Sequence, residues 1–345
     1  MPNENKLTLH LRLEDAVALA FFLINLAMRI VFRELQRRNL SPADVLIIIP
    51  AVTLLLTKEL VHHFVGGKES PLEAGHGLRD FVRPYWGIVR DWFPFLVILL
   101  MYYSLWGDAT HLLVRTDRDV ELIALDQKLF GFQASLAIQP LIRPALTEWM
   151  SFSYFFHVLN IPVVACFIYI WKSRERFREM MCGILVVCFF GLLGYLLVPA
   201  IGPMYTLRDQ YTVPLYQSLE VFNRETEFMD FARIQRDVFP SLHVGISFVV
   251  WLYAWRNSQR LGWILSPLVL SLWVSTIYLR YHYLVDVVAG LILAPLCYGL
   301  ANWLFKRFGE IRCAVPLSAA WAARYPWLVH PAPATEMAEK VEERP

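Results

Sequence analysis

Two histidines and one aspartate carry the clearest chemical signal in the sequence. His243 lies in FPSLHVG and His282 in RYHYLVDVVAG, each at the start of an apolar stretch. Asp286 follows His282 by four residues, so the two side chains share one face of a helix. A carboxylate at this spacing accepts the imidazole Nδ1–H, which fixes the tautomer and leaves Nε2 available. The pattern therefore predicts an imidazole that acts as a nucleophile or a base.

Groups that bind anions surround these histidines. Pro240 suits the first turn of a helix, and the adjacent Ser241 can donate a hydroxyl hydrogen bond. Backbone N–H groups at a helix N-terminus attract phosphate, and helices that start near 240 and 282 would point at one place. The nearby cations are Arg208, Arg233, Arg236 and Arg280. Such a set can neutralise a phosphoryl transition state without a metal ion, so we expect no metal and no other cofactor.

The composition excludes an ordinary water-soluble domain. Of the 345 residues, 57% are hydrophobic and 18% are charged, with a mean hydropathy of +0.44. Soluble proteins have about 45–50% apolar and about 25% charged residues. The net charge of +2 gives no indication of a nucleic-acid partner. The five cysteines form no CxxC pair, so neither a disulfide framework nor a zinc site is expected.

Long apolar segments predict the fold class, because lipid offers the backbone no hydrogen-bond partner and a spanning helix needs about 20 apolar residues. We expect an all-α, polytopic membrane bundle with a six-span catalytic core. Two weaker segments, 15–32 and 44–65, would add one or two N-terminal membrane segments, for seven or eight in total. The six core spans are expected at 93–113, 152–171, 179–199, 242–255, 262–280 and 284–305.

Charges in the loops predict the orientation of the core. Lysine and arginine gather at 172–178, at 256–261 and after the last span, which all lie on one side if the six spans alternate. The positive-inside rule makes that side cytoplasmic, so both histidines face the extracytoplasmic side. The sequence divides into an N-terminal part with membrane segments and an amphipathic linker, the core, and a partly disordered tail. Their expected ranges are 1–92, 93–312 and 313–345.

FPSLH followed by RYHYLVD resembles the type 2 phosphatidic acid phosphatase superfamily, most of all the branch of inositol-phosphorylceramide synthase and the sphingomyelin synthases. The resemblance covers roughly 93–305 and implies an enzyme that acts on a lipid phosphoester through a phosphohistidine. It implies that His282 attacks phosphorus, that Asp286 orients it, and that His243 protonates the leaving oxygen. The expected substrate-binding residues are Ser241, Arg208, Arg236 and Arg280.

The sequence departs from the superfamily pattern in two places. The phosphatases carry a lysine seven residues before an arginine-proline pair, and the pairs at 83–84 and 143–144 lack it. The positional equivalent is VPAIGPMYTLRD, residues 198–209. The serine-arginine pair before the last histidine is also absent; Ser275 and Thr276 stand there, and the arginine is displaced to Arg280. Both departures favour the transferase-like branch.

Several alternatives stay open at this stage. Water as the acceptor gives a lipid phosphatase, and a lipid or headgroup hydroxyl gives a phosphotransferase. Two competing hypotheses are a transporter lined by polar residues and a haem protein with His243 and His282 as axial ligands. The partners expected are a lipid phosphate substrate and the bilayer, and the sequence sets no oligomeric state.

Other polar residues carry weaker signals. His157, in SYFFHVLN, is interpreted as a hydrogen-bonded core histidine, although it could reach the site. His62 and His63 point to different sides of a helix and are interpreted as interfacial. Asp126 and Glu148 fall in the outer 114–150 segment, and their spacing assigns them no role.

Overall fold

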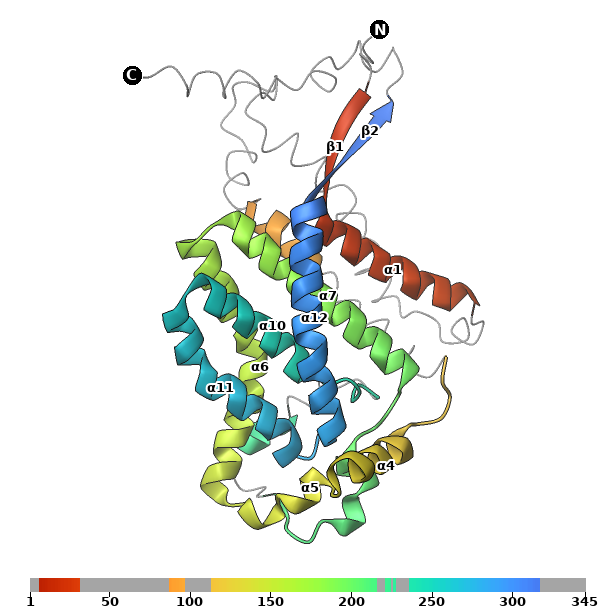
Figure 1. Cartoon of the computed structure of the whole chain (residues 1–345), viewed down its shortest axis with the longest axis vertical. Helices are drawn as coiled ribbons and strands as arrows, with labels where there is room; N and C mark the ends of the chain where they lie inside the picture. Colours follow the sequence, from red (N-terminus) through yellow and green to blue (C-terminus); the bar gives the residue numbers. More distant parts are fainter. Residues whose placement is uncertain are drawn as a thin grey trace.

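The computed structural model describes residues 6–31, 87–96, 113–215, 221–224, 226–227 and 236–316 (Figure 1). The expected segment 44–65, most of the expected span 93–113 and the tail beyond residue 316 lie outside the described residues. His62, His63 and Arg233 also lie outside them.

Among the described residues, five helices form the core of the bundle, and they confirm the all-α polytopic class. Four of them, α6, α7, α11 and α12, are long and apolar enough to cross a membrane; α10, with 16 residues, is shorter. Each begins within a few residues of an expected span, with one exception at α6. Their bounds are α6 Pro144–Trp171, α7 Arg174–Leu197, α10 Leu242–Asn257, α11 Gln259–Tyr278 and α12 Leu284–Phe308.

Helix α6 starts two turns before the expected position near 152. Pro144 occupies its first turn, where a missing N–H costs nothing. The extra turns are partly polar, and Thr147 in them shares a hydrogen bond of 2.9 Å with the Tyr278 hydroxyl at the end of α11. Hydropathy marks only the apolar part of a helix, so it missed these turns.

Helices α10 and α12 approach each other closely, which brings the two histidine motifs together. The Ser241 N–H, just before α10, donates to the Asp286 carbonyl in α12 at 3.1 Å. A Cβ at Gly290 would lie only 2.6 Å from the Ser241 carbonyl oxygen and 3.0 Å from the Val244 Cβ. Only glycine therefore permits this packing, and a larger residue at 290 would push the two helices apart.

A two-stranded ribbon and one further helix join the N-terminal region to the core. Strand β1 (Lys6–Arg12) pairs antiparallel with β2 (Glu310–Pro316), and Arg12 lies opposite Glu310. Helix α1 (Leu13–Val31) corresponds to the expected segment 15–32 and packs on α7. The ribbon was not expected, and the boundary expected between 312 and 313 falls within β2.

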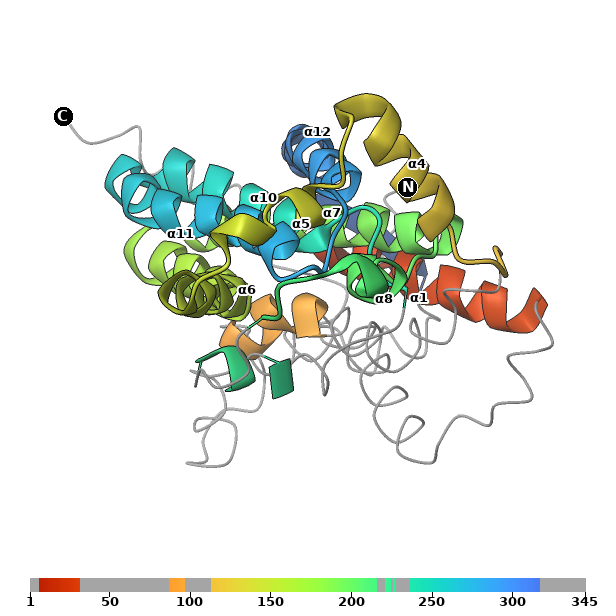
Figure 2. The same ribbon diagram turned by 90° about the horizontal axis from the view of Figure 1, so that it is seen from below.

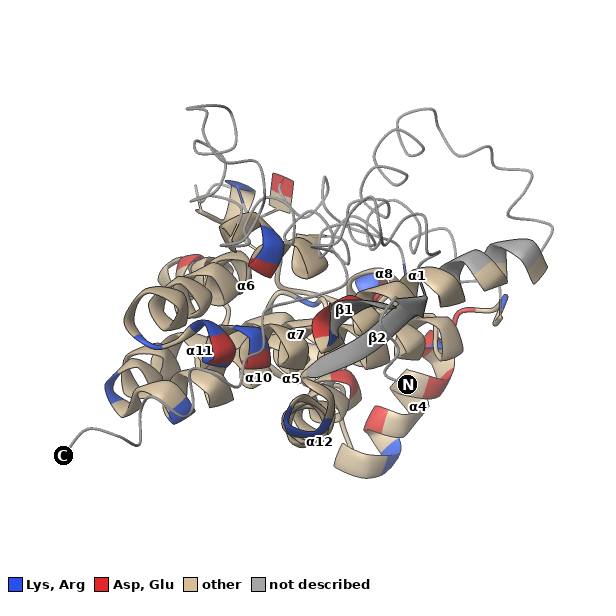
Figure 3. Cartoon of the chain, turned by 90° about the horizontal axis from the view of Figure 1, so that it is seen from above, with Lys and Arg blue, Asp and Glu red and all other residues tan. Residues whose placement is uncertain are grey.

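The end of the bundle next to the ribbon is rich in basic residues, and ion pairs join its elements to one another. Figure 3 looks onto this end, where lysine and arginine colour α11 and α12. Buried Glu14 pairs with Arg178 at 2.6 Å, and buried Asp91 pairs with Arg12 at 2.7 Å and with Arg174 at 2.8 Å. These pairs hold α1 and the helical segment 87–96 against the start of α7.

The opposite end is covered by short elements. In the view from below, α4 runs beside the start of α12 (Figure 2). Buried apolar residues on α4, on the 198–209 segment and at the start of α12 form a small cluster of their own, separate from the main core. The covering elements are α4 Asp119–Phe130, α5 Ala134–Ala137, η3 Gln139–Leu141, α8 Pro203–Thr206 and η4 Arg208–Gln210.

Candidate active site

The two histidines meet at the covered end of the bundle, as their positions in the sequence predict. His243 lies in the first turn of α10, and His282 lies two residues before α12. Their nearest ring nitrogens, His243 Nδ1 and His282 Nε2, are 3.3 Å apart, and the two rings meet edge to face. His282 is 2% exposed. Two imidazoles thus direct one nitrogen each at the same point.

Asp286 stands behind His282 on the side away from His243. Its Oδ2 lies 3.5 Å from His282 Nδ1 and accepts the backbone N–H of Tyr283 at 2.8 Å. The carboxylate is completely buried. The expected pairing of Nδ1 with the carboxylate is present, with Nε2 directed at His243, but the two residues do not share a helix face, because His282 precedes α12.

A tight turn after α11 sets the position of His282. Arg280 adopts a left-handed backbone conformation, with φ of 68°, and the N–H groups of Tyr281 and His282 both donate to the Thr276 carbonyl, at 2.9 and 3.0 Å. A side chain with a Cβ seldom occupies this conformation. The turn reverses the chain between two spans and points the arginine and histidine in different directions.

The start of α12 does not offer free N–H groups to a phosphate, so that part of the expectation is wrong. The Leu284 and Val285 N–H groups donate to the two carboxylate oxygens of Asp126 on α4, at 3.0 and 2.8 Å. Burial raises the pKa of the Asp126 carboxyl above its usual range, while these two N–H donors act in the opposite direction. Asp126 therefore caps the helix that carries Asp286, a role that its spacing in the sequence does not reveal.

Asp119, which lies on α4 seven positions before Asp126, holds the segment 198–209 in place. It accepts the N–H groups of Ile201 and Gly202 at 3.0 and 2.8 Å, and the Tyr283 hydroxyl at 2.8 Å. Gly202 has φ of 95°, a conformation open to glycine. The segment 198–209, which the sequence predicts to replace the missing lysine motif, is thus linked through Asp119 to the residue after His282.

The start of α10 is capped by its own serine. Ser241 is fully buried, and its Oγ accepts the Val244 N–H at 3.5 Å. Pro240 lies one residue before this cap, outside the first helical turn that the sequence predicted for it. The side chain of Ser241 contributes to the site by starting the helix that carries His243; its predicted contact with substrate stays a prediction.

Two residues of α6 complete the surroundings of His243; the sequence interpretation favoured a core role for the one, His157, and did not consider the other, Tyr154. The Tyr154 hydroxyl lies 2.9 Å from His243 Nε2, and its ring stacks on the imidazole with centroids 4.7 Å apart. The His157 ring packs against His243 at 4.6 Å, and the His157 Nδ1 has no hydrogen-bond partner. His157 is therefore a neighbour of the site and not a hydrogen-bonded residue of a distant core. The signal that could have revealed both is their i, i+3 spacing in SYFFHVLN.

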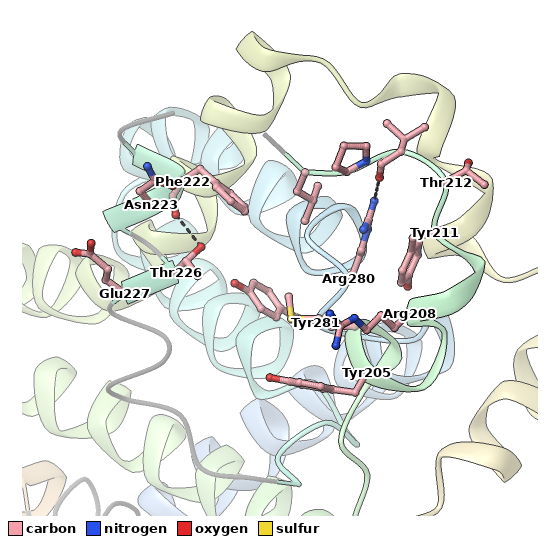
Figure 4. A pocket seen from close by; sticks show the side chains of 14 residues that line it. Tyr205, Arg208, Tyr211, Thr212, Phe222, Asn223, Thr226, Glu227, Arg280 and Tyr281 are labelled. Carbon is pink, nitrogen blue, oxygen red and sulfur yellow. Dashed lines mark hydrogen bonds between the residues drawn. The ribbon is translucent and has the colours of Figure 1, made fainter. Parts of the chain in front are cut away.

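A cavity of about 830 Å³ lies at this end of the bundle, and neither His243 nor His282 is among the residues that line it (Figure 4). Arg280 and Tyr281, the two residues before His282, form part of its wall, together with Arg208 from η4. The Tyr281 ring lies 4.7 Å from the Tyr154 ring, which connects this wall to His243. Figure 4 shows Asn223, Thr226 and Glu227 on the side opposite Arg208 and Tyr211. The cavity thus offers both cations and hydroxyl, amide and carboxylate groups.

Arg280 is held without any carboxylate partner among the residues that the structure describes. Its guanidinium donates to the Val213 carbonyl and stacks over the Tyr211 ring, 3.9 Å from the centroid. Its Nε has no hydrogen-bond partner. Burial lowers the pKa of the Arg280 guanidinium from its usual value, as expected for a cation removed from water. A partly desolvated cation of this kind favours an anionic ligand.

Arg236, another expected phosphate ligand, is placed differently. Its guanidinium pairs with Asp117 at 2.5 Å, and it is not among the residues that line the cavity. The structure therefore brings together His243, His282 and Asp286, with Arg280 and Arg208 at the adjoining cavity, and it leaves Arg236 outside this group.

Comparisons with known proteins place the chain in a family. A family model described as the PAP2 superfamily matches residues 120–300. A phosphoinositol dihydroceramide synthase of Bacteroides thetaiotaomicron is 26% identical over 214 residues, which cover 55% of this chain and 68% of that protein. A PA-phosphatase related-family protein of Dictyostelium discoideum is 26% identical over 139 residues, which cover 37% of this chain and 23% of that protein. No solved structure matches. The family match spans more than half of the sequence and contains both histidine motifs, so the chain belongs to the PAP2 superfamily, the type 2 phosphatidic acid phosphatases.

Proposed function

We propose that this integral membrane protein transfers a phosphoryl group from a lipid phosphoester through a covalent intermediate on His282. The observation that carries the proposal is the pair of facing nitrogens, His282 Nε2 and His243 Nδ1, 3.3 Å apart, with Asp286 behind the first. The adjoining cavity supplies cations, and the similarity to a phosphoinositol dihydroceramide synthase supports a lipid substrate.

The first half of the reaction forms the phosphohistidine. His282 Nε2 attacks phosphorus while its Nδ1–H is held by Asp286, which stabilises the positive charge that develops on the ring. The bond from phosphorus to the leaving oxygen breaks, and His243 gives that oxygen a proton from Nδ1. The two rings must move apart to admit the phosphoryl group between them.

The second half reverses the proton transfer. His243 Nδ1 takes the proton of the acceptor hydroxyl while the acceptor oxygen attacks phosphorus, and the bond to His282 Nε2 breaks. Arg280 and Arg208 stabilise the charge on the phosphoryl oxygens. The same residues can activate water or an alcohol as the acceptor. The acceptor used therefore depends on which hydroxyl group reaches His243. The relative from Bacteroides and the polar wall of the cavity favour a lipid or headgroup hydroxyl over water.

The site is proposed to open at the outer leaflet. Arg174, Arg256, Lys306 and Arg307 mark the other end of the bundle, and the positive-inside rule places that end in the cytoplasm. The substrate chains would lie between the spans while the headgroup occupies the cavity.

Product analysis of the purified protein tests this function. Lipids labelled with ³²P in the phosphoester are incubated with the protein, with and without a lipid bearing a free hydroxyl. A new labelled lipid identifies a phosphotransferase, and free phosphate identifies a phosphatase. Rapid acid-free quenching should trap label on the protein in a form stable to base and labile to acid, as a phosphohistidine is.

Two inhibitors separate this mechanism from the alternatives. Vanadate mimics pentacoordinate phosphorus and should block turnover, and a chelator should leave turnover unchanged because arginines and histidines neutralise the charge. Strict Mg²⁺ dependence, or a protein that transfers no phosphoryl group and shows a strong Soret band, contradicts the proposal.

A further inference from the structure

The second nitrogen of His243 has a partner that the mechanism above does not use. Nδ1 faces His282, while Nε2 lies 2.9 Å from the Tyr154 hydroxyl. The Tyr154 side chain is 3% exposed, and its ring also stacks on the imidazole. Both ring nitrogens of His243 are therefore engaged, and the orientation of the ring is fixed from two sides.

We propose that Tyr154 is a positioning residue that holds His243 as the proton carrier of the reaction. The Tyr154 oxygen accepts the Nε2–H of His243, so that the proton exchanged with leaving group and acceptor is always the one on Nδ1. This inference rests on the proposed function, because it assigns a partner to the acid of that reaction.

The proton count follows directly. In its charged form His243 carries a proton on each nitrogen, and Nδ1 gives its proton to the leaving oxygen as the bond from phosphorus to that oxygen breaks. The neutral ring keeps Nε2–H on Tyr154 and has a lone pair on Nδ1. That lone pair then takes the acceptor's proton, which restores the charged form. Without the phenol, the charged ring loses one of the two contacts that direct Nδ1–H at the leaving oxygen, which weakens the acid. The neutral ring could also carry its proton on Nδ1, and this tautomer cannot act as the base.

The two histidines thus have different partners for different tasks. His282 has a carboxylate 3.5 Å from Nδ1, and a negative charge makes the opposite nitrogen a better nucleophile. His243 has a neutral phenol, which fixes the tautomer without holding the proton as tightly as a carboxylate would. An acid that must also act as a base needs this weaker hold.

Substitution of Tyr154 by phenylalanine tests the inference, since it removes the hydroxyl and keeps the stacked ring. Two phosphoester substrates are compared, which carry the same phosphoryl group to be transferred. In one the leaving group is the alcohol of a short-chain alkyl lipid, and in the other it is 4-nitrophenol. Alkoxides need a proton to leave, whereas 4-nitrophenolate does not. Tyr154→Phe should lower kcat/KM about 10- to 100-fold for the alkyl ester, and at most about threefold for the nitrophenyl ester.

Tyr253→Phe is the matched control. Tyr253 lies on α10 with His243, is equally buried, and bonds through its hydroxyl to Asn302 at 2.8 Å, away from the site. Tyr253→Phe should lower kcat/KM for the two esters by the same factor, or leave both values unchanged. The ratio of the two kcat/KM values does not depend on the fraction of folded protein, so a poorly folding variant still gives an answer.

The outcomes are distinct. An unchanged ratio in Tyr154→Phe, with the wild-type protein active on both esters, overturns the role of Tyr154 and leaves the proposed function standing. A wild-type protein that transfers the phosphoryl group of neither ester overturns both. A ratio that shifts equally in Tyr253→Phe shows a general packing effect and also overturns the role of Tyr154.

Discussion

The two ends of the bundle differ in the groups that contact their buried carboxylates. At the basic end, Glu14 and Asp91 are neutralised by arginines at 2.6 to 2.8 Å. At the covered end, Asp119 and Asp126 accept hydrogen bonds from backbone N–H groups and a tyrosine hydroxyl. Asp286 accepts one backbone N–H through Oδ2, which also lies 3.5 Å from the His282 imidazole. No arginine pairs with these three aspartates in the described part of the chain.

This difference has a consequence for the cations. Where arginine and carboxylate neutralise each other, the charges serve only to hold helices together. At the covered end, backbone N–H and hydroxyl groups take the place of cations around the aspartates, which leaves buried Arg280 and exposed Arg208 available to the anion that we propose binds in the cavity. A buried charge that the protein does not neutralise itself favours an anion from outside. The unequal pairing thus distinguishes the proposed binding site from the end whose charges hold helices together.

Loss of the nucleophile should have the largest effect. His282→Ala removes the atom that bonds to phosphorus, so we expect turnover and protein labelling to fall below detection, by about 10⁴-fold or more. Incubation with labelled lipid, followed by gel analysis and product separation, measures both. His243→Ala should still accept label from an activated ester, because only proton transfer is lost. Equal activity of His282→Ala and the wild-type protein would contradict the covalent mechanism.

Removal of Arg280, which has no carboxylate partner in the described part of the chain, should have the second-largest effect. Arg280→Met should lower kcat/KM about 10²- to 10³-fold, the usual effect of losing one preorganised donor to a transition-state anion. Arg236→Met is the matched control, because Arg236 shares the left-handed backbone of Arg280, with φ of 70°, but pairs with Asp117 outside the cavity. Steady-state kinetics on both variants test the comparison. Equal losses would show that pairing with a carboxylate does not distinguish the two arginines.

Loss of the cap on α12 should have a moderate effect. Asp126→Ala leaves two helix N–H groups without their acceptor, at a cost of about 1 kcal/mol, and loosens the support of Asp286. We expect kcat to fall about 10-fold with KM little changed, since a positioning defect weakens the transition state more than substrate binding. Asp126→Asn keeps one acceptor oxygen and should recover part of kcat. Gln127→Ala, exposed on the same helix, is the control and should match the wild-type protein.

The sequence was informative where chemistry follows periodicity. His282 and Asp286 are only four residues apart, and the superfamily motifs lie in segments of clear apolar character, so the bundle and the histidine pair could be predicted, although His282 precedes α12 and does not share its face with Asp286. The branch of the superfamily was also indicated by the motifs, and the family match confirms the membership.

The parts that could not be predicted depend on contacts between segments distant in the chain. Asp126 caps α12 across 158 residues, and Tyr154 contacts His243 across 89. The i, i+3 spacing of Tyr154 and His157 indicates a shared helix face, but it does not show that this face meets His243. The left-handed turn at Arg280 is set by the Thr276 carbonyl, which local propensity does not encode. Arg236 was expected at the site because it is close in sequence to His243, yet its partner Asp117 lies 119 residues away.

The smallest effect on catalysis is expected at the basic end. Glu14→Gln leaves Arg178 buried without its carboxylate, which should destabilise the fold by about 3–5 kcal/mol. Turnover per folded molecule should stay within about twofold, because in the comparison above this charge holds α1 to α7 and faces no ligand. Thermal unfolding in detergent and kinetics normalised to vanadate-binding sites separate the two quantities. Glu121→Gln breaks an exposed pair with Arg118 at the covered end and should change neither. A loss of turnover per folded molecule in Glu14→Gln would show that the two ends are coupled, and the division between scaffold and site would not hold.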